Sequence, residues 1–212
     1  MDLTKLLSGN QEPNPRGQAD PEQLRILAAA RTEFVDHGFR TAAVGNICRR
    51  ARVSRPTLYR RFGDKDAIFR AVISNEAVSY FSSITTDILA IDDPGARTEE
   101  AFVLAARAAY QNDLLASLRK LEPELLADLF TDPTSTNREM VVTAIATTLS
   151  TESLPFSEML GLAEVMVRLF ASLLFAPTGN LPMETDVYAR ALARKYFVPM
   201  IEAAVRRAAN AE

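Results

Sequence analysis

Apolar residues recur at helical spacing along most of the chain, and no stretch alternates apolar and polar residues for long enough to predict a strand. In residues 44–51 the apolar side chains fall at i, i+3, i+4 and i+7, which predicts a short helix. A second short helix is expected at 55–62, because Ser54 is a good N-cap and Pro56 suits a first helical turn. Two short helices joined by so brief a break predict a helix-turn-helix.

Longer helices are expected on both sides of this motif. Asp20, followed by a proline and by Gln23, predicts the start of a helix that ends at Gly38. Asp64 is expected to cap a long helix over 65–89, which would measure roughly 36 Å at the usual rise per residue. Further apolar periodicity predicts helices at 97–121, 122–130, 135–150, 156–176 and 183–209. We therefore expect an all-α protein of nine helices, with a flexible arm at 1–19, a helix-turn-helix domain at 20–66 and a helical body at 67–212.

Charge divides the chain into two parts. The net charge is −3, which by itself argues weakly against a nucleic-acid partner. Residues 40–65, however, carry eight basic residues against one acidic residue, and we call this segment the basic head. Residues 67–212 carry twelve basic residues against nineteen acidic ones. This asymmetry of sign indicates that the basic head binds a polyanion.

The second short helix carries the side chains best suited to reading DNA. Its expected outer face presents Arg55, Thr57 and Tyr59, together with further arginines, while Leu58 points inward. Arg55 could pair with the O6 and N7 atoms of guanine, and the Thr57 methyl group could contact a thymine methyl group. A lysine beside a helix N-terminus, as Lys65 is, suits a phosphate contact. The sequence therefore predicts a helix that enters the major groove.

Two helices near the end of the chain bear on assembly. The helix expected at 156–176 is apolar on nearly every face, and that at 183–209 has a second apolar stripe with a kink near Pro199. A helix that is apolar on every face must pack against other helices on every side. The two helices could form a four-helix interface with a second copy of the chain, or the first could be the central core helix of a monomer.

Composition excludes several classes of site. One cysteine and one histidine exclude a disulfide framework and make a Cys/His metal site improbable, and we expect Cys48 to be a core residue. The chain has no glycine-rich phosphate loop, nucleophile elbow or zinc-protease motif, so we expect neither a cofactor nor an enzyme. With no signal-peptide pattern and no long apolar run, we expect a cytoplasmic protein that does not enter membranes.

The segment around the two short helices resembles the TetR family of bacterial transcriptional regulators. About fifty residues carry the resemblance, and the matched positions are Phe34, Gly38, Phe39, Ile47, Val53, Ser54, Thr57, Leu58, Tyr59, Phe62 and Lys65. The resemblance implies a homodimer that binds a palindromic operator in double-stranded DNA, usually as a repressor. It also implies that residues 67–212 form a ligand-binding and dimerisation domain, with the dimer built from the helices at 156–176 and 183–209. A small-molecule effector in this domain would move the long connecting helix and release the DNA.

The resemblance also assigns residues. It implies that Arg55, Thr57 and Tyr59 face base edges and nearby phosphates, and that Arg61 and Lys65 hold phosphates. The complete set of expected DNA contacts is Arg49, Arg52, Ser54, Arg55, Thr57, Tyr59, Arg60, Arg61 and Lys65. Arg49, Arg50 and Arg60 could equally form a solvated basic face. If the body holds a ligand pocket, we expect Phe102, Tyr110, Asn112, Met166 and Phe170 to line it, with Tyr110, Gln111 and Asn112 orienting the ligand.

Four positions depart from the family pattern. Ala42 and Ala43 stand where the family usually has a Thr/Ser pair, so we expect Thr41 to cap the first short helix instead. Gly45 stands at a position where members of the family often have a residue that contacts the DNA groove. Arg52 replaces the usual turn glycine, so either an arginine adopts a left-handed conformation or the turn has another shape. A different class of function also stays open, namely a helical small-molecule carrier or enzyme whose basic head binds an acidic partner.

Overall fold

A computed structural model describes residues 20–132, 134–175 and 177–210, and over these ranges the chain is helical with no strand beyond a single bridge between Thr151 and Leu154. The expected all-α class is confirmed. The elements are α2 (Pro21–Thr41), α3 (Val44–Ala51), α4 (Arg55–Phe62), α5 (Lys65–Leu89), α6 (Pro94–Gln111), α7 (Asp113–Leu121), α8 (Pro123–Thr131), α9 (Thr136–Leu149), α10 (Phe156–Phe175), α11 (Asp186–Leu192), the π-helical segment η1 (Ala193–Phe197) and α12 (Val198–Ala209). The expected arm at 1–19 lies outside the described residues.

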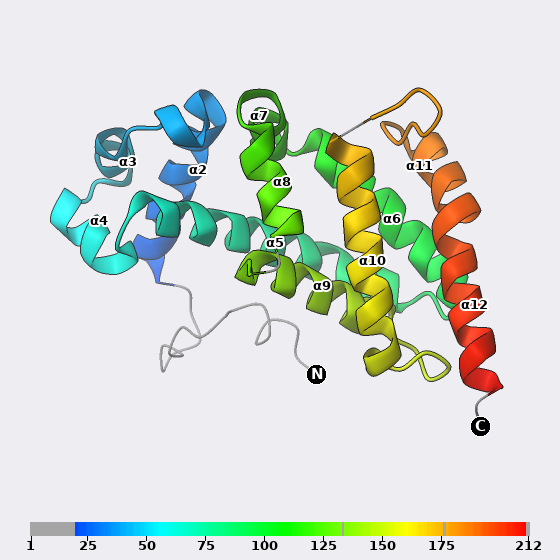
Figure 1. Ribbon diagram of the computed structural model, residues 1–212. Helices are drawn as coiled ribbons and strands as arrows, with labels where there is room; N and C mark the ends of the chain where they lie inside the picture. Colours follow the sequence, from blue (N-terminus) through cyan, green and yellow to red (C-terminus); the bar gives the residue numbers. More distant parts are fainter. Residues whose placement is uncertain (1–19, 133, 176, 211–212) are drawn as a thin grey trace.

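Helices α2, α3 and α4 gather at one end of the molecule, and α5 runs from them into the body (Figure 1). The core of this end includes Phe34, Ile47 and Leu58, none of which is exposed to solvent. The same core also contains Leu114, Leu118 and Leu126 from α7 and α8. The helix-turn-helix end therefore shares its core with helices much later in the chain, and a domain boundary at residue 66 stays a prediction.

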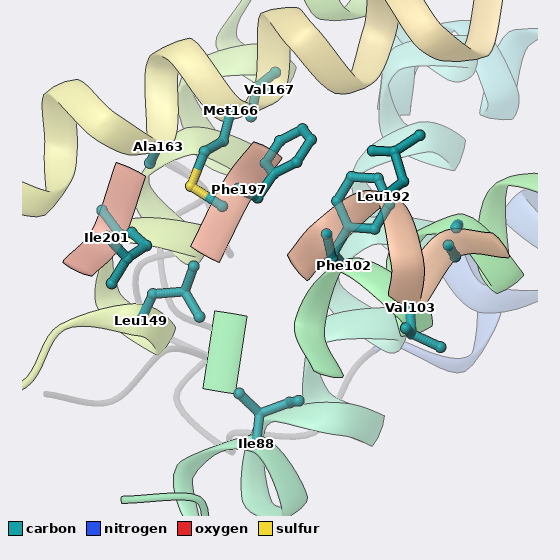
Figure 2. Packing of buried hydrophobic residues seen from close by; sticks show 14 of the residues in the cluster. Ile88, Phe102, Val103, Leu149, Ala163, Met166, Val167, Leu192, Phe197 and Ile201 are labelled. Carbon is teal, nitrogen blue, oxygen red and sulfur yellow. The ribbon is translucent and has the colours of Figure 1, made fainter. Parts of the chain in front are cut away.

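The body packs α6, α9, α10 and the C-terminal helices around a second core (Figure 2). The rings of Phe102 and Phe197 lie with their centroids 4.5 Å apart, and the rings of Phe102 and Phe170 lie 5.6 Å apart. Helix α10 stands beside α12 at the end of the molecule away from α4 (Figure 1). The core thus joins α6, from the middle of the chain, to its last helices.

The helix expected at 97–121 is two helices, α6 and α7, separated at Asn112. The Asn112 side-chain oxygen accepts hydrogen bonds from the backbone N–H groups of Leu114 (2.9 Å) and Leu115 (3.1 Å). Asparagine is among the best N-caps because its short side chain satisfies N–H groups that a helix leaves free. The break therefore has a local cause that apolar periodicity does not reveal.

The helix expected at 183–209 also differs, because it begins at Asp186 and changes its hydrogen-bond pattern midway. Within η1 the Val198 N–H bonds the carbonyl of Ala193, five residues earlier. Pro199 has no N–H to donate and its ring crowds the preceding turn, so the widened π turn accommodates it. With these two corrections, nine helices is too low a number for the described residues.

Candidate nucleic-acid interface and body cavity

The start of α3 is held by a residue of α2 and not by its own cap. Ala43 is the N-cap residue and has no side chain able to cap the helix, while Thr41 is the last residue of α2, so the expected Thr41 cap is wrong. Glu33, only 1% exposed, replaces it: its Oε1 accepts hydrogen bonds from the Ala43 N–H (3.1 Å) and from Asn46 Nδ2 (2.8 Å). Burial alone raises the pKa of Glu33, but these hydrogen bonds outweigh burial and lower the pKa below its ordinary value. The carboxylate is therefore ionised and fixes α3 against α2.

The turn between α3 and α4 contains an arginine in the left-handed region. Arg52 has φ 58° and ψ 45°, which confirms the first of the two alternatives for this turn. The Val53 N–H bonds the Cys48 carbonyl at 3.0 Å and closes the end of α3. A non-glycine residue in this conformation costs roughly 1–2 kcal/mol. The Arg52 side chain is exposed and adds a cation beside the start of α4.

Helix α4 is anchored on one side and open on the other. Ser54 caps it by accepting a hydrogen bond from the Thr57 N–H at 3.1 Å, and Leu58 is fully buried beneath it. On the opposite side Arg55 and Arg60 are exposed, and Tyr59 is 43% exposed. The predicted inward position of Leu58 and outward positions of Arg55 and Tyr59 are confirmed. Thr57 differs, because it is half-buried and its hydroxyl lies 2.8 Å from Ser54 Oγ.

The basic residues around α4 differ in what they already contact. Arg61 lies 2.5 Å from Asp20 and 3.4 Å from Glu22, both at the start of α2. The hydrogen bond from the Glu22 N–H and that from Arg61 lower the pKa of Asp20. The charge of Arg61 is therefore balanced within the chain, which makes it a weaker candidate for a phosphate contact than its neighbours.

Arg55 and Arg60 have no ion pair with any residue in the described part of the chain. The Arg55 guanidinium rests against α3 at Gly45, where an added Cβ would stand 2.8 Å from Nη2. The missing side chain at Gly45 therefore gives Arg55 room between the two helices. Arg49 donates to the Asn46 side chain at 3.0 Å and stays exposed.

Lys65, at the first position of α5, bonds within the chain as well. Its Nζ donates to the carbonyl of Arg40 at 3.0 Å and lies 4.9 Å from the centre of the Phe39 ring. The Arg40 N–H in turn bonds Glu122 Oε1 at 2.5 Å. Lys65 thus ties α5 to the end of α2, and the remaining ammonium hydrogens are available to a phosphate.

A cavity of about 230 Å³ lies in the body between α5, α6, α9 and α10. Four of the five residues expected to line a ligand pocket do line it, namely Phe102, Asn112, Met166 and Phe170. Figure 2 shows Phe102 and Met166 within the surrounding core. The expectation for Tyr110 is wrong for this cavity, because its ring packs 4.7 Å from the Arg119 guanidinium carbon and is not part of the lining.

Three polar residues that the sequence analysis did not predict also line the cavity: Glu76, Tyr80 and Thr148. Nothing in the sequence distinguishes them from other polar residues of these helices. Glu76 Oε2 accepts a hydrogen bond from Asn112 Nδ2 at 2.8 Å, and its Oε1 lies 3.0 Å from Arg31 Nε on α2. The Tyr80 hydroxyl and the Thr148 Oγ1 are buried and have no hydrogen-bond partner among the residues that the structure describes. Burial raises the pKa of the Tyr80 phenol, so the ring is neutral and carries its O–H hydrogen.

The face of α10 turned away from the core is also apolar in part. Met159, Ala163 and Val167 are buried, whereas Val165 is 44% exposed and Leu169 is 42% exposed. The C-terminal helices continue this exposure at Val187, Tyr188 and Tyr196. Large exposed apolar side chains on adjacent helices are typical of a protein interface.

The described residues contain neither a metal-binding cluster nor a helix that could span a membrane. Across 20–132, 134–175 and 177–210 no cluster of His, Cys, Asp or Glu side chains is arranged to hold a metal ion. Over the same ranges no helix combines the length and apolar character needed to cross a membrane.

Comparison with protein families gives a match at the helix-turn-helix end. The model described as "Bacterial regulatory proteins, tetR family" matches residues 26–72. An uncharacterized HTH-type transcriptional regulator of Mycobacterium bovis is 29% identical over 126 residues, which are 59% of this chain and 64% of that protein. The HTH-type transcriptional regulator UidR of Escherichia coli K12 is 40% identical over 60 residues, 28% of this chain and 31% of UidR.

Solved structures share the fold over most of the chain. The TetR family repressor AlkX of Dietzia, implicated in biodegradation of n-alkanes, superposes with a TM-score of 0.68 at 19% identity and covers 89% of this chain and 99% of its own. A TetR-family regulator structure from Mesorhizobium loti superposes with a TM-score of 0.57 at 17% identity, over 84% of this chain and 96% of its own. Residues 26–72 of this chain therefore match the TetR family of bacterial regulatory proteins, and the chain as a whole shares the fold of these solved structures.

Proposed function

We propose that the chain regulates transcription by binding a palindromic operator in double-stranded DNA through α4. The observation that carries this proposal is the arrangement of that helix, in which Leu58 is fully buried and Arg55, Tyr59 and Arg60 are exposed on the other side. A rigid helix that presents guanidinium and hydroxyl donors fits the major groove, where bases differ in their acceptors and donors. Arg55 and Tyr59, with Thr57, contact bases and nearby phosphates, while Arg52, Arg60 and Lys65 contact the backbone.

The experiment is a binding assay against DNA selected from a random pool by the purified chain. We expect the logarithm of the affinity to fall with the logarithm of salt concentration, with a slope of about −0.9 per phosphate neutralised. Arg55→Ala should relax the sequence preference at one base pair of each half-site and remove about 1–3 kcal/mol of discrimination against the wrong base there. Lys65→Ala should weaken binding to all DNA sequences alike. Lys120→Ala, at an exposed residue of α7, removes the same charge outside α3, α4, α5 and the proposed dimer helices, and is the control.

Two results would contradict parts of this proposal. If the pool yields no preferred sequence and unrelated DNA binds equally well at physiological salt, the basic head does not read an operator. The alternative of a carrier or enzyme with an acidic protein partner then gains support. Equal losses across operator variants with Arg55→Ala would overturn the base-reading role of that residue while leaving DNA binding in place.

The proposal includes a homodimer formed by α10 with α11, η1 and α12. The support is the exposed apolar side chains on these neighbouring helices, among them Val165, Leu169 and Tyr196. A symmetric pair of such faces buries them and presents two copies of α4 to successive half-sites. Leu169→Glu should convert the dimer to a monomer in light scattering and weaken operator binding. Leu89→Glu, at a side chain 46% exposed on α5, is the matched control and should do neither.

We further propose that a small-molecule effector in the body cavity releases the DNA, so that the chain acts as a repressor. The cavity wall includes Glu76 and Asn112, and Glu76 bonds Arg31 in the helix against which α3 packs. A ligand that displaces Glu76 therefore disturbs α2 directly. AlkX is described as a repressor, whereas FasR of Mycolicibacterium smegmatis, 34% identical over 76 residues, is described as an activator. Repression predicts that reporter expression rises when the gene for this chain is deleted.

A further inference from the structure

The body cavity contains hydroxyl groups that the fold leaves without partners. Thr148 is 3% exposed, its Oγ1 is buried and unpartnered, and it belongs to the cavity lining. The hydroxyl of the adjacent Thr147 bonds the carbonyl of Thr143 at 2.8 Å, which is the usual solution for a threonine inside a helix. Thr148 does not use this solution. The Tyr80 hydroxyl, on the α5 wall, is likewise buried and has no partner in the described part of the chain.

Unpartnered buried hydroxyls in a protein interior require an explanation, because each loses its hydrogen bonds to water on folding. A bound molecule with a hydrogen-bonding atom would supply what the fold does not. Both groups are neutral, since burial raises the pKa of the Tyr80 phenol and threonine does not titrate. They therefore offer donors to an acceptor oxygen or nitrogen.

The remaining lining argues against a charged ligand. Glu76 is its one carboxylate, and both oxygens are engaged, one by Arg31 and the other by Asn112. No lysine, arginine or histidine of the described residues is part of the lining, and Arg107, whose charge acts on the Tyr80 hydroxyl, is already paired with Asp186. An anion would therefore find no unpaired counter-charge. The other lining side chains are apolar apart from Asn112, Tyr80 and Thr148. An ion moved into such a site without a partner is strongly disfavoured.

The volume of the cavity limits the size of the ligand. An apolar cavity of about 150 Å³ in another protein accommodates a benzene ring. In proportion, the cavity of about 230 Å³ holds a molecule of about nine heavy atoms. The aromatic wall of Phe102, Phe170 and Phe197 offers ring contacts to such a molecule.

We propose that the effector is a small uncharged molecule, apolar over most of its surface, with a hydrogen-bond acceptor bound by at least one of the Tyr80 and Thr148 hydroxyls. This class includes aromatic and alicyclic ketones, esters and ethers of about nine heavy atoms. The inference rests on the proposed function only in treating the cavity as an effector site. Binding to the cavity can be measured without DNA, and operator binding can be measured without any such molecule, so the two fail separately.

The test uses four probes that share a phenyl ring on a trigonal or branched carbon and have about the same size: acetophenone, cumene, benzoate and benzamidine. Calorimetry and the melting temperature of the full chain report binding, since a ligand of the native state raises the melting temperature by mass action. We expect acetophenone to bind, and benzoate and benzamidine to bind at least about a hundredfold more weakly because of their unpaired charge.

Two variants test the hydroxyl contacts, and one serves as control. Thr148→Val and Tyr80→Phe should each weaken acetophenone about five- to tenfold while changing cumene, which has no acceptor, by less than about twofold. If only one of the two variants weakens acetophenone binding, the hydroxyl removed in that variant makes the contact. Thr147→Val, next to Thr148 but with its hydroxyl bonded within the helix, should change neither probe.

Three outcomes would overturn the inference. The first is an absence of acetophenone binding at about 10 mM, a concentration at which even a millimolar ligand raises the melting temperature. The second is binding of benzoate or benzamidine as tight as that of acetophenone. The third is unchanged acetophenone affinity in both Thr148→Val and Tyr80→Phe while these variants keep the cumene affinity and fold of the parent chain.

Discussion

Replacing Glu33 by alanine should destabilise the helix-turn-helix end more than any change on its surface. Glu33 is 1% exposed and supplies the acceptor for the Ala43 N–H and for the Asn46 amide. Loss of a helix cap costs about 0.5–2 kcal/mol. Loss of a hydrogen bond to a charged group costs about 1.5–3 kcal/mol. Because the two losses overlap at one carboxylate, we expect Glu33→Ala to lower the free energy of unfolding by about 3 kcal/mol.

For a chain of this length, about 1 kcal/mol shifts the melting temperature by roughly 2–4 °C, so Glu33→Ala should lower it by roughly 6–12 °C. Circular dichroism during heating and urea unfolding measure both quantities. Operator affinity should fall as well, since α3 positions α4. Asp36→Ala on the same helix is the control, because Asp36 is 3.6 Å from Arg50 and their side chains are 45% and 47% exposed. Such a surface pair contributes at most about 1 kcal/mol.

A free energy of unfolding for Glu33→Ala within about 0.5 kcal/mol of that of the parent chain, which is the range of ordinary surface substitutions, would contradict this prediction. An equal loss of stability in Asp36→Ala and Glu33→Ala would contradict it as well. Either result would mean that α3 holds its position without the carboxylate of α2. In that case the alanines at 42 and 43 would have no replacement for the missing cap.

Three further predictions follow from the same contacts. The pKa of Glu33 is lowered in the folded chain, so the stability that its charge contributes is fully present above its ordinary pKa of about 4.5. This stability is lost as the pH falls through the folded pKa. The difference in melting temperature between Glu33→Gln and the parent chain should therefore shrink below about pH 4.5. Arg31→Met should reduce the effect of acetophenone on operator affinity, a coupling that is typically 5- to 150-fold, because Arg31 joins Glu76 of the cavity wall to α2; operator binding with and without acetophenone measures it. Thr148→Val should raise the melting temperature of the ligand-free chain by a few degrees, since it removes an unpartnered buried hydroxyl, and a fall would contradict the absence of a partner.

The helix-turn-helix was predictable because its boundaries are set by neighbours in the sequence. Helices α3, α4 and α5 have the expected bounds, and the Ser54 and Asp64 caps bond N–H groups three residues later. Gly38, with φ 74°, stands where the first expected helix ends, although regular hydrogen bonding resumes to Thr41. A cap and its partner within one turn leave a pattern that a single sequence displays.

The cap on α3 and the cavity were not predictable in the same way. Glu33 acts ten residues away, across a helix kink, and nothing distinguishes it from other acidic residues in the sequence. Tyr80 and Tyr110 both lie on helices of the body, yet Tyr80 lines the cavity and Tyr110 packs on Arg119. Packing of distant helices decides such cases, and helical periodicity records only which residues avoid water.

The shared core indicates why a ligand in the body would affect the DNA-binding end. Leu114 and Leu118 of α7 are fully buried in the core that also holds Ile47 and Leu58. The start of α7 is fixed by Asn112, whose oxygen caps the helix and whose amide bonds Glu76 on the cavity wall. A molecule that moves Asn112 therefore moves the first turn of a helix that is itself part of the helix-turn-helix core. Because close-packed cores transmit strain instead of absorbing it, α7 offers a second route beside α5 by which occupancy of the cavity changes the position of α4.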